Sequence, residues 1–116
     1  MSKKANQVSL KVIGDGDFIP EVLESEPPVL VAFLAAWSHP CQVLRAVLKE
    51  VAPEIFPRVK VAIIDADDHP GLSISYGIHS IPTLLYFADG RERARTVGTV
   101  SKKAILSQLK QLTPGE

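Results

Sequence analysis

Apolar residues along this chain form either continuous runs or helically spaced positions. Residues 29–34 and 59–65 are apolar on both faces of an extended chain, with Lys60 as an interruption, which is typical of strands covered on both sides by helices. Residues 8–13 alternate weakly and predict a short first strand, and residues 83–87 predict another buried strand. These runs indicate a central sheet.

Two longer stretches have helical periodicity. The first begins at Cys41, and Pro53 is expected to end or kink it because proline lacks an N–H and clashes with the preceding turn. The last helix is expected to begin after Ser101 as its cap. The inward positions are Leu44, Val47, Leu48, Val51 and Ile55 in the first helix, and Ile105, Leu109 and Leu112 in the last.

Turn residues divide the rest of the chain. A short helix is expected after the turn at residues 14–17 and before Pro27-Pro28, and another from residues 67–70, with His69 as its cap, to Tyr76-Gly77. The apolar face of the first of these helices comprises Phe18, Val22 and Leu23. Asp89-Gly90 predicts a hairpin into residues 91–97.

The resulting order is βαβαβαββα, which predicts an α/β fold with a mixed sheet between helical layers. Arginines at alternate positions, Arg91, Arg93 and Arg95, are typical of an exposed edge strand. The 116-residue chain is 46% hydrophobic, so we expect one domain over residues 8–112 with disordered tails at 1–7 and 113–116.

The composition narrows the function further. Net charge is zero with both signs interspersed, which argues against a nucleic-acid surface or a basic membrane patch. No apolar run has the length of a membrane helix or the features of a signal peptide. The single cysteine cannot form an internal disulfide, which agrees with a reducing compartment. We therefore expect a cytoplasmic monomer without a cofactor.

Residues 37–41, Trp-Ser-His-Pro-Cys, lie where the run 29–34 gives way to the helix beginning at Cys41. Backbone N–H groups at a helix N-terminus favour an anion, so a sulfur in the first turn is more nucleophilic there. This junction is the main candidate for chemistry.

This pentapeptide resembles the Trp-Cys-Gly-Pro-Cys site of the thioredoxin family, with Ser38 in place of the nucleophilic cysteine and His39 in place of the glycine. Residues 65–70, residues 76–83, the Asp89-Gly90 hairpin and Val97-Gly98 follow in the family's order and spacing. The resemblance implies the thioredoxin fold over nearly the whole chain.

The resemblance also implies impaired dithiol chemistry. Exchange by the family needs one thiolate to attack a disulfide and a second to resolve the mixed disulfide. Ser38 cannot take the first role, and Cys41 corresponds to the resolving cysteine. Ala32 corresponds to the family's buried aspartate and Val61 to the nearby lysine, so no general base is expected beneath Cys41.

Simpler roles remain open for each residue of the motif. Ser38 is expected to be a helix N-cap, and Cys41 is either a small buried residue or a working thiol. His39 is expected to be an exposed residue shaping a groove. A metal site of Cys41, His39 and His79 lacks ligating spacing, so we expect no metal.

In the family, the Ile81-Pro82 bond is cis, and this segment holds an extended substrate by strand addition. We therefore expect a groove for a protein or peptide partner. Its residues are Trp37, His39, Pro40, Cys41, His79, Ile81, Pro82, Val97 and Gly98.

Three alternatives to a binding module remain. The protein could be a one-cysteine exchanger in which glutathione resolves the mixed disulfide, or a thioredoxin carrying an engineered Cys-to-Ser change at Ser38. Two copies could also be joined through Cys41, by a disulfide or by a shared cluster or metal.

Overall fold

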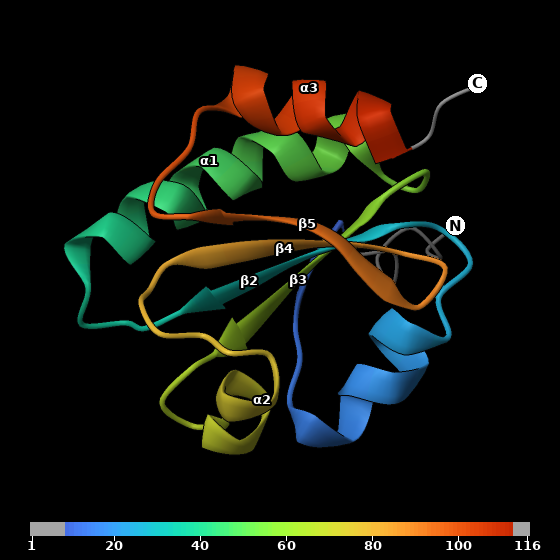
Figure 1. Cartoon of the computed structure of the whole chain (residues 1–116). Coiled ribbons are helices and arrows are strands. Elements are labelled where there is room, and N and C mark those ends of the chain that lie inside the picture. Colours follow the sequence, from blue (N-terminus) through green and yellow to red (C-terminus); the bar gives the residue numbers. More distant parts are fainter. Residues whose placement is uncertain (1–8, 113–116) are drawn as a thin grey trace, which may run out of the picture.

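A five-stranded mixed sheet lies between two layers of helices in the computed structural model, which describes residues 9–112 (Figure 1). The strand order is β1-β3-β2-β4-β5, with β1, β2 and β3 parallel and β4 and β5 antiparallel to their neighbours. The strands are β1 (Leu10–Val12), β2 (Val29–Leu34), β3 (Lys60–Asp65), β4 (Thr83–Ala88) and β5 (Arg91–Val97). This architecture confirms the predicted mixed sheet and agrees with the thioredoxin fold.

Two long helices cover one face of the sheet, α1 (His39–Ile55) and α3 (Lys102–Leu112). Their apolar positions meet the inward side chains of the strands in one continuous cluster, because helical and strand periodicity both point those residues at the sheet. The predicted amphipathic helices are therefore confirmed. Pro53 was expected to end or kink this helix, and α1 continues past it to Ile55, so the helix does not end at Pro53.

Short elements cover the opposite face: η2 (Asp15–Asp17), η3 (Ile19–Leu23) and α2 (Pro70–Ser75). Three aromatic rings form the centre of this layer, with ring centroids 5.4 to 5.9 Å apart. Those rings belong to Phe18, Tyr76 and Phe87. The packing of these rings holds the short elements on the sheet.

The first predicted helix differs from the structure in kind. Residues 15–17 form a 3₁₀ turn and residues 19–23 a π-helical turn, which ends at Glu24, before Pro27. The Glu24 N–H bonds the Ile19 carbonyl, five residues earlier, at 2.9 Å, which is the hydrogen bond of a π-helical turn.

The hairpin between β4 and β5 is confirmed. Asp89 has φ 54° and Gly90 has φ 75°, the left-handed conformation that a two-residue I′ turn requires. A Cβ at Gly90 would lie 2.8 Å from the Leu23 carbonyl oxygen, so this turn packs directly on η3. The alternate arginines of β5 are exposed, as expected of an edge strand.

The start of the first strand differs from its predicted position. The first strand begins at Leu10, whereas Val8 and the predicted tails at 1–7 and 113–116 lie outside the described residues. The peptide bond at Ile81-Pro82 is cis, and so is the bond at Phe56-Pro57, which the sequence reading did not anticipate.

Candidate functional site

Ser38 is the N-cap of α1. Its backbone is extended, with φ −96° and ψ 122°, and its Oγ accepts a hydrogen bond from the Cys41 N–H at 3.3 Å. The residue is only 6% exposed. The predicted capping role is confirmed, and the hydroxyl is used to satisfy a backbone donor at the helix N-terminus.

Cys41 lies in the first turn of α1 and is 2% exposed. Its Sγ accepts a hydrogen bond from the Ala35 N–H at 3.4 Å, which orients the sulfur toward the end of β2. The thiol belongs to the apolar cluster beneath α1. This placement agrees with a small buried residue.

Ala32 and Val61, which correspond to the family's aspartate and lysine, are not direct cross-strand partners. The register of β2 and β3 pairs Ala32 with Ile63, whereas Val61 pairs with Leu30. All of these side chains are apolar and buried. Ala32 and Ile63, which belong to the same apolar cluster as Cys41, therefore carry no carboxyl or amine group.

Cys41 is one of the residues that line a small pocket of about 150 Å³, called here the Cys41 pocket. Two charged residues, Arg45 and Asp65, also line it. Its remaining lining comprises Val12, Leu34, Ala35, Ala36, Gln42 and Ile63. This volume holds about five water molecules at the volume of each in the liquid.

A larger, shallow pocket of about 490 Å³ lies beside Trp37 and is called here the Trp37 pocket. Its lining comprises Trp37, Ala66, Asp67, Ser73, Ile78, His79, Ser80 and Ile81. Trp37 is 72% exposed, and its Nε1–H donates a hydrogen bond to Asp67 Oδ2 at 2.7 Å. The indole is thus held in place while most of its surface faces solvent.

The predicted groove residues are distributed as follows. Trp37, His79 and Ile81 come together in the Trp37 pocket, whereas Cys41 lines the Cys41 pocket instead. Five others lie outside both linings: His39 and Pro40 are exposed in the first turn of α1, Pro82 is buried, Val97 is 60% exposed, and the Gly98 N–H bonds the Pro82 carbonyl at 2.8 Å.

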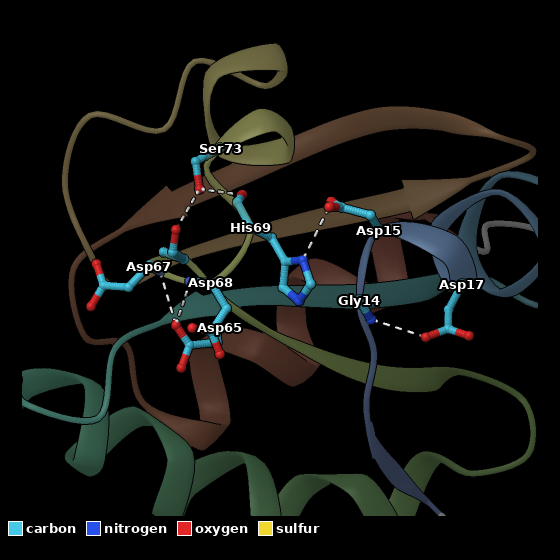
Figure 2. Close-up of polar contacts among 9 residues, drawn as sticks. Gly14, Asp15, Asp17, Asp65, Asp67, Asp68, His69 and Ser73 are labelled. Carbon is cyan, nitrogen blue, oxygen red and sulfur yellow. Dashed lines mark hydrogen bonds and ion pairs between the residues drawn. The ribbon is translucent and has the colours of Figure 1, made fainter.

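An acidic loop borders the Trp37 pocket between β3 and α2 (Figure 2). Asp65 Oδ1 accepts hydrogen bonds from the backbone N–H groups of Asp67 at 2.9 Å and Asp68 at 3.1 Å. These two bonds fix the turn and leave Asp67 and Asp68 exposed. The sequence reading took these residues only as a helix start, although their position after a buried strand could have marked them as site residues.

His69 occupies the N-cap position of α2, but its side chain forms no cap hydrogen bond, contrary to the capping role expected. Its Nδ1 lies 3.2 Å from Asp15 Oδ2, a distance typical of an ion pair, without the angle of a hydrogen bond. The imidazole packs against Gly14, where a Cβ would lie 2.9 Å from Cε1. His69 therefore links α2 to the turn before η2.

Within residues 9–112, no three His, Cys, Asp or Glu side chains are grouped so as to hold a metal ion. In the same part of the chain, no helix combines the length and apolarity needed to cross a membrane.

Comparisons with a family model and with individual known proteins point to the same family. The family model described as Thioredoxin matches residues 9–111. The protein named Thioredoxin 1 from Synechococcus elongatus is 41% identical over 97 residues, which cover 84% of this chain and 91% of that protein. A Mycobacterium bovis protein named Thioredoxin is 38% identical over 114 residues, covering 98% of this chain and 97% of its own.

Proposed function

The chain belongs to the thioredoxin family, and on that premise we propose that it binds an extended segment of a partner protein at the Trp37 pocket without dithiol turnover. One observation carries this proposal. Cys41 is the only cysteine of the chain, and it lines a different pocket from the one that the exposed Trp37 lines. This difference supports partner binding at a surface where Cys41 is not part of the lining.

The chemistry of Ser38 supports the absence of turnover. A hydroxyl does not form a disulfide, and the Ser38 hydroxyl already accepts the Cys41 N–H. The cross-strand pair Ala32 and Ile63 offers no group that could take a proton from the Cys41 thiol. Reduction of a substrate disulfide by the two-sulfur route therefore lacks its first step.

The exposure of Trp37 supports the binding role. Large aromatic residues at the surface are enriched where proteins bind one another, because they bury much area at little entropic cost. Ile81 lies in the same pocket, and Val97 adds exposed apolar surface on β5. An extended segment laid along Ile81 and Pro82 would bind by strand addition.

Turnover is tested by measuring reduction of insulin disulfides by the protein and by the Ser38→Cys variant. We expect no reductase activity in the protein and measurable activity in the variant, because the variant restores the attacking sulfur. Equal activity in the two proteins would overturn the proposal.

Binding is tested with the fluorescence of Trp37, which is the only tryptophan in the chain. A neutral, tryptophan-free peptide with four apolar residues between serines is titrated, and binding is expected to shift the emission to shorter wavelength as the indole is buried. Ile81→Ser should weaken binding, whereas Val12→Ser, at an exposed residue lining the Cys41 pocket, should not. Equal weakening in both would contradict the assigned groove.

A second candidate function is one-cysteine exchange with glutathione, because Cys41 is among the residues that line a pocket. In that reaction the Cys41 thiolate attacks the glutathione sulfur of a mixed disulfide and releases the protein thiolate. A second glutathione thiolate then attacks the Cys41–glutathione bond, which yields oxidised glutathione and regenerates Cys41. A pocket of about 150 Å³ is small for a tripeptide, because ligand sites typically hold about 300 Å³ or more, and so we rank this function second.

The alkylation rate of Cys41 by iodoacetamide separates the two functions. For the binding module we expect the native protein to react at least about tenfold more slowly than the unfolded one, because the sulfur is buried. A native rate equal to or above the unfolded rate would favour the exchanger. In either case we propose a monomer, because Cys41 is buried and not available to join two copies. We also propose the reducing cytoplasm, because a single cysteine cannot form an internal disulfide.

A further inference from the structure

We propose that the partner segment bound at the Trp37 pocket carries lysine or arginine next to its apolar residues. This inference rests on the proposed function and names the chemistry of its partner. It starts from the distribution of charge, because the zero net charge of the chain conceals a strong local imbalance.

The segments that build the Trp37 pocket contain no cationic side chain of the lysine or arginine type. Neither residue occurs between Lys11 and Arg45, or between Lys60 and Arg91. These two stretches hold nine of the thirteen acidic residues, five in the first and four in the second. All eight residues lining the Trp37 pocket belong to them. The pocket lining itself holds one carboxylate, that of Asp67, and no lysine or arginine.

Asp67 places a carboxylate in the lining itself. Its Oδ2 accepts the Trp37 indole N–H, while its side chain remains exposed at the rim. Figure 2 shows Asp67 on the outside of the acidic loop, with its carboxylate directed away from His69. The backbone bonds to Asp65 hold this loop in shape, so the position of the charge is fixed before a partner arrives.

Trp37 offers a second attraction for the same cation. The indole is 72% exposed and is held by its bond to Asp67, so its face is available for a guanidinium or ammonium group. A cation beside Asp67 would contact carboxylate and ring together. An anionic partner would meet only repulsion there.

Arg95, which reaches the Tyr76 carbonyl, does not cancel the charge of this region. Arg95 Nη2 donates to the Tyr76 carbonyl at 2.7 Å, but its guanidinium is paired with Glu92 at 2.6 Å. Other groups near the pocket that can become cationic are His79 in its lining, His39 in the first turn of α1 and His69 next to Asp68. Arg45 lines the neighbouring Cys41 pocket together with Asp65. The carboxylates of Asp67 and Asp68 thus remain for a partner's charge.

The test uses three tryptophan-free peptides with the same four-residue apolar core, flanked by lysine, serine or glutamate, and follows Trp37 fluorescence. We expect the lysine peptide to bind about threefold or more tightly than the serine peptide, and the glutamate peptide to bind most weakly. Salt at about 0.5 M should reduce these differences by screening.

Matched amide variants locate the effect. Asp67→Asn with Asp68→Asn should bring the lysine and serine peptides to similar affinity, because both charges are removed while an amide oxygen at position 67 can still accept the indole N–H. Asp89→Asn, at the exposed β4–β5 turn, should leave the preference unchanged. Lysine preference retained in the double variant would overturn the inference.

The outcomes also separate this inference from the function on which it rests. Equal affinity for all three peptides, or tightest binding of the glutamate peptide, would overturn the cationic preference and leave the binding function standing. Failure of all three to bind would overturn both.

Discussion

The two faces of the sheet are built in different ways. On one face, α1 and α3 present regular apolar stripes to the strands and bury most of their leucines and isoleucines. On the other face, elements of six residues or fewer are held by an aromatic cluster, by the close contact of Gly90 with Leu23, and by an acidic loop. The two regular helices stabilise the fold through the apolar area that they bury, whereas the short elements position exposed side chains. The Trp37 pocket lies where the second kind of layer meets the N-terminus of α1.

The faces also differ in charge. Helix α3 carries Lys102, Lys103 and Lys110 and no acidic residue, whereas Asp65, Asp67 and Asp68 gather before α2. A protein with equal numbers of both charges therefore presents two unlike surfaces.

The largest expected effect lies on the helical face. Leu48→Ala removes a fully buried side chain of α1 and should lower the free energy of unfolding by about 2–5 kcal/mol, through lost burial and the cavity left behind. Leu72→Ala, at a half-buried position of α2, should cost less. Urea unfolding measures both, and equal losses would break the contrast between the faces.

The next effect tests the close contact on the acidic face. Gly14→Ala places a Cβ 2.9 Å from the His69 ring and should cost about 1–3 kcal/mol, whereas Gly16→Ala meets no atom within 4 Å and should not destabilise. Adding His69→Ala should relieve the cost of Gly14→Ala. Additive losses in the double variant, measured by urea unfolding, would show that the clash is not the cause.

Caps on the two helices of the first face provide a smaller test. Ser38→Ala removes the acceptor for the Cys41 N–H and should cost about 1 kcal/mol. Ser101→Ala removes the acceptor for the Ala104 N–H and should cost less, because Ser101 is exposed and water can replace it. Thermal unfolding compares them, and a larger loss at Ser101 would contradict this explanation.

The smallest effect is a dependence on pH. Hydrogen bonding to Lys11 lowers the pKa of Glu21, with further attraction from Lys60. A lowered folded-state pKa contributes stability above the unfolded value near 4.5, and this stability is lost as pH falls through the folded pKa. We expect a few tenths of a kcal/mol for this partly exposed group. Glu21→Gln should remove that part of the acid dependence in urea unfolding at pH 7 and pH 3.

Local patterns were sufficient for much of the fold. The apolar run of β2, the cap at Ser38 and the turn at Asp89-Gly90 each depend on residues close in sequence, and the structure agrees with them. The π-helical turn at residues 19–23 was missed, and Phe18, which precedes it, packs on Phe87, a residue distant in sequence.

The site was less predictable because long-range contacts shape it. Trp37 and Asp67 are thirty residues apart in sequence, and His69 meets Asp15 across an even longer interval. The register that pairs Ala32 with Ile63 likewise depends on how two distant strands align. A motif read locally located the site near Trp37, but it did not reveal that Cys41 lines a separate pocket.

The packing of Gly90 on Leu23 has a consequence for protein engineering. Hairpin tips are usual choices for inserting an epitope or a reporter domain, because they normally project into solvent. Here any side chain at Gly90 would meet the Leu23 carbonyl, so an insertion between Asp89 and Gly90 would push on η3. Gly71, where an added Cβ meets no atom within 4 Å, leaves more room for a label.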